Sequence, residues 1–395
     1  MLPAWIQIPA FAENDSIELI PGGKPFFDAL EAGIAAAREE IHFQTYIFND
    51  DETGRRVLHM LREAADRGVQ VYLVADGFGS STLSPQTRRE IRESNIHFRF
   101  FGRYLTANLR FGRRLHHKIV VFDHRTALIG GINVADKYND INGQAAWLDF
   151  AVRFSGQAVE QAHTRCLEIW EKKKKTPWKT RFKKSRKRIL ARLRTNDWFL
   201  GRNEITSSLK SAFRHAEHSI TLVAAYFIPT KGIMAALKKA SSRGVKVRIM
   251  LGRVSDVRVA RSATRYLYGW MLRNGIEIYE WPSTVLHAKV AVVDNYWTTI
   301  GSYNLNFLSV FESIEANLEI ADEEFATKVK ELISHKMLQE CEQITSQEYQ
   351  AKHPILLKAS DWLAFYFLWA IARFFFFLDK NGPPIKGYQL EQIED

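Results

Sequence analysis

Cysteine is scarce in this sequence. Only Cys166 and Cys341 occur among its 395 residues. Two distant cysteines do not form a disulfide framework, so we expect a protein of a reducing compartment. The metal-binding patterns H-x-x-E-H and C-x-x-C are also missing, as is any cluster of carboxylates along the chain. We therefore predict no metal site and no cofactor.

An N-terminal secretion signal is also missing, because MLPAWIQIPAFAENDS has no basic segment followed by a long apolar run. Acidic residues are in deficit: 44 Asp and Glu stand against 55 Lys and Arg, a net charge of +11 and a pI of about 9.5. Such a chain is attracted to polyanions, and both nucleic acid and an anionic membrane qualify. At 46% hydrophobic and 25% charged residues, it is typical of a globular protein with two or three domains.

The chain contains an internal repeat. A helical segment, 25–40, precedes a strand-like segment at Ile41–Phe48, and in the second half Glu204–Glu217 precedes Ile220–Pro229. In both halves another helical pattern follows and ends in R-G-V before a β-branched strand, the usual signal of a helix end. Strands that alternate with helices predict βαβ units. We expect an α/β fold of two lobes related by a pseudo-two-fold axis. Each lobe would be a mostly parallel mixed sheet flanked by helices, with the active site between the lobes.

These patterns divide the chain into four parts: a first lobe at 1–170, a polybasic linker at 171–198, a second lobe at 199–350 and a C-terminal tail at 351–395. The linker contains EKKKKTPWKTRFKKSRKRILARLR. It is either a solvated connection, a contact to anionic lipid headgroups or a nucleic-acid arm. The interleaved Trp178 and Phe182 favour the lipid interpretation, since such aromatic residues settle at membrane interfaces.

The tail contains an aromatic segment, Trp362–Leu378, with Arg373 as its one basic residue. As a helix it would be roughly 25 Å long, shorter than the hydrocarbon core of about 30 Å. It is either a packed helix of the protein, a membrane span or an anchor that lies in one leaflet. Its aromatic composition favours the leaflet anchor.

A duplicated motif carries the chemistry. Each half contains H-x-K-x4-D, and six further residues separate each motif from G-[GS]-x-N. The members are His116, Lys118, Asp123 and Asn133 in the first half, and His287, Lys289, Asp294 and Asn304 in the second. Histidine and lysine two apart on a strand point to the same face. If the lobes pack together, two imidazoles, two ammonium groups and two amides converge into a pocket that suits a phosphodiester.

The duplicated motif resembles that of the phospholipase D superfamily, and in particular the bacterial cardiolipin synthases without N-terminal transmembrane helices. The resemblance covers about Ile17 to Ile320. It implies a two-step reaction without metal, in which one histidine attacks phosphorus and the other protonates the leaving alcohol and activates the incoming one. It further implies that His116 is the nucleophile and His287 the acid and base. Both lysines and both asparagines would hold the phosphoryl oxygens.

The resemblance also implies an acidic residue, some thirty positions downstream, that orients each histidine. Asp149 and Glu319 occupy these places, and Glu315 is the nearest competitor of Glu319. Asp123 and Asp294 complete the catalytic motif, and we expect them to hold backbone or lysine in place. His117 and His124 lack counterparts in the second half and are interpreted as surroundings of the motif.

The function that follows is cardiolipin synthesis: transfer of a phosphatidyl group from one phosphatidylglycerol to another, with release of glycerol. We expect the enzyme at the cytoplasmic face of the bacterial inner membrane, bound to its anionic surface. The alternatives are a hydrolytic phospholipase D, a phosphodiesterase or nuclease of the same superfamily, and a lipid-binding protein without activity. The apolar tail argues against nucleic acid as the partner.

Overall fold

The computed structural model describes residues 11–102, 113–171, 189–306 and 313–378. The first lobe begins at β1 and ends with α4. Its elements are β1 (Ala12–Pro21), α1 (Lys24–Ala36), β2 (Glu40–Thr45), α2 (Glu52–Asp66), β3 (Gln70–Asp76), α3 (Pro85–Glu93), β4 (His97–Phe101), β5 (Arg114–Leu115), β6 (Lys118–Phe122), β7 (Thr126–Gly130), the 3-10 turn η2 (Asp136–Tyr138), β8 (Phe150–Gly156) and α4 (Gln157–Glu171).

The second lobe repeats this order and then adds a C-terminal extension. Its elements are β9 (Ile189–Asp197), η3 (Trp198–Leu200), β10 (Arg202–Asn203), α5 (Glu204–His215), β11 (Ser219–Ala224), α6 (Lys231–Ser242), β12 (Lys246–Gly252), α7 (Arg258–Tyr266), α8 (Tyr268–Arg273), β13 (Glu277–Trp281), β14 (Lys289–Val293), β15 (Trp297–Gly301), β16 (Ser313–Ala321), α10 (Glu323–Gln339), β17 (Glu342–Ile344), α11 (Ser346–Lys352) and α12 (Ile355–Leu378).

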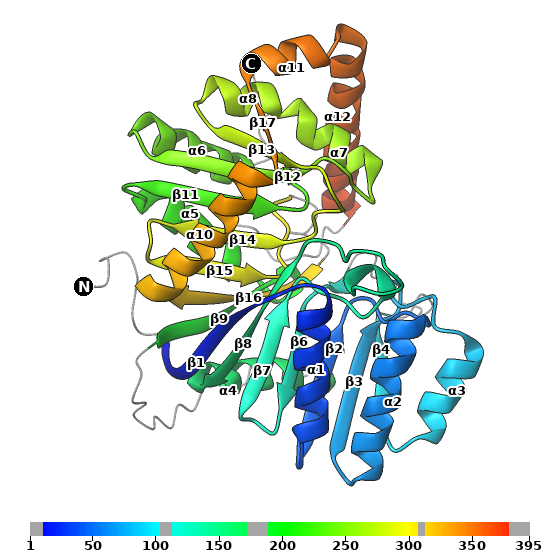
Figure 1. Cartoon of the computed structure of the whole chain (residues 1–395). Helices are drawn as coiled ribbons and strands as arrows, with labels where there is room; N and C mark the ends of the chain where they lie inside the picture. Colours follow the sequence, from blue (N-terminus) through cyan, green and yellow to red (C-terminus); the bar gives the residue numbers. More distant parts are fainter. Residues whose placement is uncertain (1–10, 103–112, 172–188, 307–312, 379–395) are drawn as a thin grey trace.

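The two lobes have the same strand order. It is β4-β3-β2-β6-β7-β8-β1 in the first lobe and β13-β12-β11-β14-β15-β16-β9 in the second. Strands β1 and β9 pair antiparallel through Ala12–Asn14 and Ile189–Ala191, so the sheets continue into one another between the lobes (Figure 1). The predicted pseudo-two-fold pair of mixed α/β lobes is confirmed.

The prediction that each sheet is mostly parallel is wrong. Within the seven-strand order of each lobe, as far as the structure describes it, the parallel neighbours are β2, β3 and β4, and likewise β11, β12 and β13. The motif strands β6 and β14 turn back into β7 and β15 as hairpins and are antiparallel to their other neighbours as well. The apolar runs KIVVF and KVAVV are fully buried. An apolar run indicates that a strand is buried on both faces, but it does not indicate whether the neighbouring strands are parallel or antiparallel.

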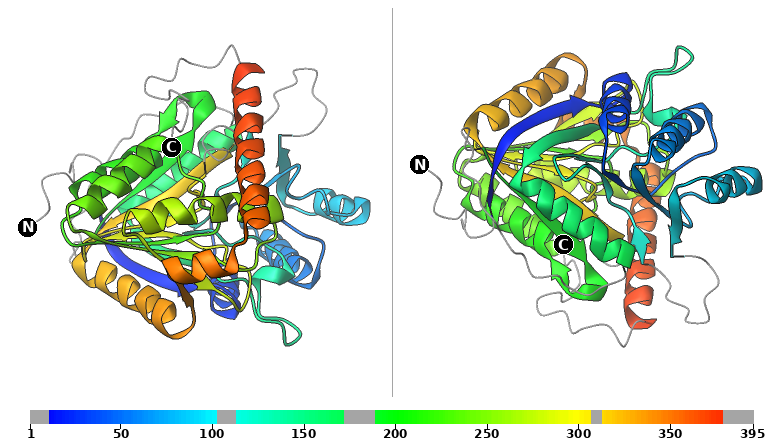
Figure 2. Two further views of the ribbon diagram at one scale, coloured as in Figure 1. Left: turned by 90° about the horizontal axis from the view of Figure 1, so that it is seen from above. Right: turned by 90° about the horizontal axis from the view of Figure 1, so that it is seen from below.

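Helices cover both faces of the sheet. In the first lobe α1 and α2 pack on one face and α4 packs on the other. In the second lobe α5 to α8 pack on one face and α10 packs on the other (Figures 1 and 2). The amphipathic α2 shows why the chain folds this way locally. Asp51 caps its N-terminus by accepting a hydrogen bond from the Gly54 N–H, and Gly68, with φ of 92°, follows its C-terminus.

The polybasic run lies within 172–188, outside the described residues. However, Ile189–Asp197, at the end of the predicted linker, is not a connection. It forms β9, the counterpart of β1, so the second lobe begins at the latest at Ile189 rather than at 199. Its arginines continue the basic composition of the preceding segment, which is why the sequence pattern placed this strand in the linker. Arg192 faces Glu319 on β16 in the ladder, and its charge is neutralised there.

The C-terminal α12 packs along α7 of the second lobe (Figure 2). Asp361 is 2% exposed and pairs with Arg265 at 2.7 and 3.0 Å. Over 355–373, where the structure describes the side chains of this helix, the other buried residues are Phe365, Leu368 and Ala372, spaced for one helical face. On another face it exposes apolar side chains: Ile355, Leu356, Trp362, Leu363 and Phe367. Of the described helices, α12 alone is long and apolar enough to cross a membrane by length and composition.

Candidate active site

The two motif histidines lie where the lobes meet. The backbone N–H groups of His116 and His117 donate to the Ile314 carbonyl of the second lobe, at 3.0 and 2.9 Å. In the same way, His287 and Ala288 donate to the Leu148 carbonyl of the first lobe, at 2.8 and 3.0 Å. Each motif is thus held in place by the backbone of the opposite lobe, and the predicted site between the lobes is formed.

The carboxylates that face the histidines are also exchanged between the lobes. Nδ1 of His287 lies 2.7 Å from Oδ2 of Asp149, and Nδ1 of His116 lies 3.0 Å from Oε2 of Glu315. Both acids are buried, at 1% and 0% exposure. A carboxylate beside Nδ1 keeps the proton of a neutral imidazole on that nitrogen and leaves a lone pair on Nε2. Each lobe therefore orients the histidine of the other.

Glu319 does not take its predicted place beside a histidine. Its carboxylate accepts a hydrogen bond from Nε of Arg192 at 2.7 Å and lies 3.7 Å from Nε of Arg194. It is a buried member of the sheet, and Glu315 stands in its expected position beside His116.

Counting along the chain produced this error, because the second lobe has a shorter connection. Asp149 follows Asn133 by 16 residues, whereas Glu315 follows Asn304 by only 11. A local signal does identify the pair. In both lobes the acid directly follows the apolar residue whose carbonyl binds the motif backbone, Leu148 or Ile314.

The ammonium groups of both motif lysines lie in the same buried region. Lys118 and Lys289 are each 5% exposed, and each donates to the carbonyl oxygen of its own motif histidine. Burial, and then the charge of Lys289, lower the pKa of Lys118 to about 7. Burial lowers the pKa of Lys289 to about 8, although the charge of Asp149 opposes the shift. Two cations are thus held close together, and the charges of Asp149 and Glu315 offset the effect of burial only in part.

Burial also governs the histidines. It lowers the pKa of His116, with the charge of Glu315 acting against it. Burial and the charge of Lys289 lower the pKa of His287 well below its usual value, and burial raises the pKa of Asp149 to about 7. Both imidazoles are therefore neutral near pH 7 until an anion enters. His116 is the more accessible of the two, with 14% of its side chain exposed against 7% for His287.

The two predicted phosphate-binding amides differ in their surroundings. Asn133 is 1% exposed, and its side chain accepts from Ile47 N–H at 3.0 Å and donates to the Tyr138 hydroxyl at 2.9 Å. It therefore shapes the site through Tyr138. Asn304 is buried as well, and its Oδ1 has no hydrogen-bond partner among the described residues.

The motif aspartates lie at the far ends of β6 and β14 from the histidines, so they do not belong to the catalytic set in which their motif placed them. Asp123 accepts the backbone N–H groups of 38, 39 and 40 at 2.8–2.9 Å. Asp294 accepts those of 217, 218 and 219 at 2.7–3.0 Å. Both have φ near 50° in the hairpin turn. They fasten the start of the neighbouring strand, which agrees with the expectation that they hold backbone.

Sequence reasoning missed the aromatic side chains of the site. The Tyr138 hydroxyl lies 3.4 Å from Nε2 of His287, and its ring packs edge-on against that imidazole. The ring of Trp147 is 6.0 Å from the same imidazole. On the other side Tyr46 packs against His116, with ring centres 4.9 Å apart. These residues belong to the segments that follow β2 and β7.

Two oriented imidazoles and two buried ammonium groups are the parts of a phospholipase D-type phosphotransfer site. The comparisons agree. The family model described as "Cardiolipin synthase, PLD-like domain" matches residues 30–166 and 209–337. The chain belongs to this family and is an enzyme of the phosphatidyltransferase class.

Named relatives cover most of the chain. Cardiolipin synthase B of Salmonella typhi is 31% identical over 345 residues, which are 84% of this chain and 83% of the relative. Cardiolipin synthase B of Escherichia coli K12 is 30% identical over 346 residues, 85% of this chain and 83% of that protein. The major cardiolipin synthase ClsA of Bacillus subtilis is 29% identical over 341 residues, 83% of this chain and 70% of the relative.

The fold is found in a solved structure as well. Phosphatidylserine synthase of Haemophilus influenzae superposes with a TM-score of 0.71 at 14% sequence identity, over 92% of this chain and 95% of that one. At this identity the likeness concerns the fold alone.

Proposed function

We propose that this enzyme makes cardiolipin from two molecules of phosphatidylglycerol through a phosphatidyl-histidine intermediate. The observation that carries the proposal is the crossed pair of carboxylates. Glu315 and Asp149 contact Nδ1 of the two imidazoles, so that Nε2 is the nitrogen that exchanges protons or attacks phosphorus. A single site thus offers one nucleophile and one acid–base group for a two-step transfer.

His116 is proposed as the nucleophile. It is the more accessible histidine, and its lowered pKa supplies the neutral form. Its Nε2 attacks phosphorus of the first phosphatidylglycerol, the bond from phosphorus to the glycerol oxygen breaks, and His287 gives the departing glycerol a proton. The lone pair of Nε2 becomes the new nitrogen–phosphorus bond, and the ring, with its proton on Nδ1, takes a positive charge that Glu315 balances.

His287 acts as the acid and then as the base. Its pKa lies well below the usual value in the free site, but the anionic phosphodiester adds a negative charge beside it and favours the protonated form. In the second step a hydroxyl of the next phosphatidylglycerol attacks phosphorus, His287 takes up the hydroxyl proton, and the nitrogen–phosphorus bond breaks. The sum is two phosphatidylglycerols converted to cardiolipin and glycerol.

Lys118 and Lys289 are proposed to bind the phosphoryl oxygens. Two ammonium groups with lowered pKa values gain more from an anion than solvated lysines do, because water does not already stabilise their charge. Asn304, with an Oδ1 that has no partner among the described residues, is buried beside the second motif. Its amide N–H groups are proposed as the additional donors. Asn133 is proposed to act only through Tyr138.

The exposed apolar face of α12 is proposed to lie on the cytoplasmic face of the bacterial inner membrane. The helix is fastened to the second lobe by the buried Asp361–Arg265 pair, a charge that would be costly inside a bilayer. We therefore propose an interfacial helix and no membrane span. The exposed Trp362, Leu363 and Phe367 suit the headgroup boundary.

The decisive experiment incubates the purified enzyme with phosphatidylglycerol vesicles and identifies the products by mass spectrometry. Cardiolipin and glycerol in equal amounts are expected. Phosphatidic acid without cardiolipin would replace the proposal with a hydrolytic phospholipase D. If cardiolipin forms only after phosphatidylethanolamine is added, one of the two proposed substrates is wrong.

Membrane contact has its own test, vesicle co-sedimentation. Leu363→Glu introduces a charge into the exposed face of α12 and is expected to weaken binding to anionic vesicles. Leu338→Glu adds the same charge at an equally exposed leucine of α10, outside α12, and serves as the control. Equal binding by both variants would refute the interfacial role of α12.

A further inference from the structure

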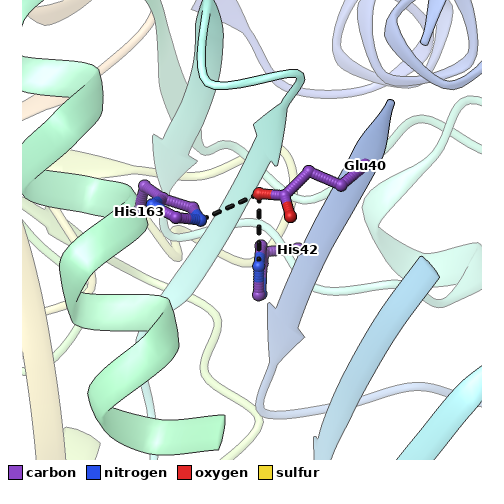
Figure 3. Close-up of side chains that lie close together, drawn as sticks. All are labelled: Glu40, His42 and His163. Atoms are coloured by element: carbon purple, nitrogen blue, oxygen red, sulfur yellow. Dashed lines mark ion pairs between the residues drawn. The ribbon is translucent and has the colours of Figure 1, made fainter. Parts of the chain in front are cut away.

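A second cluster of ionisable side chains lies in the first lobe, remote from the catalytic histidines. It combines Glu40 and His42 of β2, His163 of α4 and His124 of the turn between β6 and β7. Oε1 of Glu40 lies 2.8 Å from Nε2 of His163, 2.7 Å from Nε2 of His124 and 3.4 Å from Nε2 of His42. Figure 3 shows the imidazoles of His42 and His163 turned toward this oxygen. Three imidazole nitrogens therefore converge on one carboxylate.

The cluster is partly buried. His42 is 1% exposed, and neither of its ring nitrogens makes a hydrogen bond within the described residues. Its ring is stacked on Tyr72 at 4.7 Å, which fixes its orientation. A buried polar ring that is held in place without a hydrogen bond calls for a ligand.

The equivalent position in the second lobe contains a positively charged group. Ser219 is the counterpart of Glu40, because the motif aspartates accept the backbone N–H of both residues. Asn295 is the counterpart of His124, since each directly follows its motif aspartate. Between Ser219 and Asn295 lies the ammonium group of Lys330, which donates to Oγ of one at 2.8 Å and to Oδ1 of the other at 2.7 Å. The second lobe thus holds a cation at this position.

Among the residues that the structure describes, the first lobe has no such built-in cation. Lys330 comes from α10, the counterpart of the helix α4 that carries His163, and α4 contains no lysine. In place of a hydroxyl and an amide the first lobe presents a carboxylate and three imidazoles, the ligand types that bind a transition metal. The same structural position therefore holds the ammonium group of a lysine in the second lobe and a set of metal-ligand side chains in the first.

We propose that Glu40, His42 and His163, with His124 as the fourth ligand, bind a zinc ion. In tetrahedral zinc sites, metal–ligand distances of about 2.0–2.2 Å place the ligand atoms about 3.3 Å from one another. The 3.4 Å between Glu40 and His42 already matches. The two shorter contacts to Glu40 need to lengthen by roughly half an ångström. The ligand atoms of Glu40, His42 and His163, which lie within 4.8 Å of one another, need to draw together around the ion. The ion would fasten β2, the hairpin turn and α4 together.

This site is structural and does not depend on the proposed reaction. His124 and His116 stand at opposite ends of β6, eight residues apart, or roughly 26 Å along an extended strand. None of the four ligands belongs to the catalytic set. The ligands come from three separate segments of the sequence, which is why no short metal-binding motif marks them.

The test measures zinc in the full-length enzyme after incubation with zinc chloride and dialysis, by inductively coupled plasma mass spectrometry. About one equivalent per chain is expected, together with a Tm that rises with zinc concentration. His163→Lys removes a ligand and installs the ammonium group that the second lobe uses. It is expected to bind no zinc at this site and to have a Tm that does not respond to zinc. Should this variant not fold, Glu40→Gln provides the same comparison.

The matched control is Lys330→Met, which changes the counterpart position in the second lobe. It is expected to retain the zinc equivalent of the wild type. A wild-type enzyme that keeps no zinc after dialysis and shows no change in Tm would overturn the proposal. Zinc bound equally by the wild type and by the His163 and Glu40 variants would overturn it as well, since the metal would then lie elsewhere.

Discussion

Replacement of Glu315 by glutamine tests the crossed arrangement of the active site. In the intermediate, His116 would carry phosphorus on Nε2 and a proton on Nδ1, so its ring would be cationic beside a carboxylate 2.9–3.0 Å away. That carboxylate is 0% exposed, so water does not replace it. A hydrogen bond between charged groups contributes about 1.5–3 kcal/mol. Loss of the orienting carboxylate in serine hydrolases lowers kcat by about 10⁴. We expect kcat to fall by about 10² to 10⁴, or roughly 3 to 5 kcal/mol in the barrier.

Glu319→Gln is the control, because Glu319 is the acid that counting along the sequence selects. It is equally buried, and its replacement removes the negative charge that faces Arg192 across the ladder, so the free energy of unfolding should fall by about 3–5 kcal/mol. Turnover per folded molecule should stay close to that of the wild type. The assay follows cardiolipin formation by the fraction of each variant that remains folded, which thermal unfolding determines. A large loss of kcat in Glu319→Gln together with normal turnover in Glu315→Gln would refute the assignment.

Three further predictions concern the motif residues. His116→Ala should abolish both turnover and the covalent adduct. His287→Ala should abolish turnover and still allow a phosphatidyl adduct, which intact-protein mass spectrometry detects. Near-normal activity of either variant would disprove the two-histidine mechanism. Because Lys118 and Lys289 are cationic only below pKa values of about 7 and about 8, kcat/KM should fall as the pH rises through this range, and the fall in kcat should come at higher pH, since bound anion stabilises the cations. A profile that stays level to pH 9 would contradict this role of the lysines. Asp123→Ala should reduce the free energy of unfolding by roughly 2–4 kcal/mol, because three N–H groups lose a charged acceptor. Turnover of the folded protein should be retained. Urea unfolding and activity are measured on the same variant, and a large loss of turnover by folded protein would indicate a catalytic role instead.

The fold was largely predictable because it rests on repeated local patterns. The R-G-V step, the buried runs KIVVF and KVAVV and the repeated motif spacing recur in both halves, and each reports a local preference of the chain. The strand β9 was missed because its arginines resemble a linker until Glu319 neutralises one of them across the ladder. The direction of the motif strands was also missed, since an apolar run indicates burial and carries no information on which neighbours a strand finds.

The tail helix shows the same limit. Its composition allowed packing, spanning or interfacial placement, and residue type alone does not separate these. The buried Asp361, with its partner Arg265 almost a hundred residues earlier, identifies the face that packs against the protein. What remains exposed is an apolar face of a docked helix, which motivates the interfacial proposal.

The sequence by itself determined the reactive groups, because chemistry depends on residue type and the duplicated H-x-K-x4-D places histidine and lysine on one face of a strand. Only the tertiary structure decided their partners. Asp149 contacts His287 and Glu315 contacts His116, because each lobe supplies the carboxylate that faces the histidine of the other lobe. The connection before Glu315 is five residues shorter than the one before Asp149, so equal spacing along the sequence does not identify the pair. The cluster around Glu40 was invisible for the same reason: its ligands are separated by up to 123 residues and meet only when β2, the β6–β7 turn and α4 pack together.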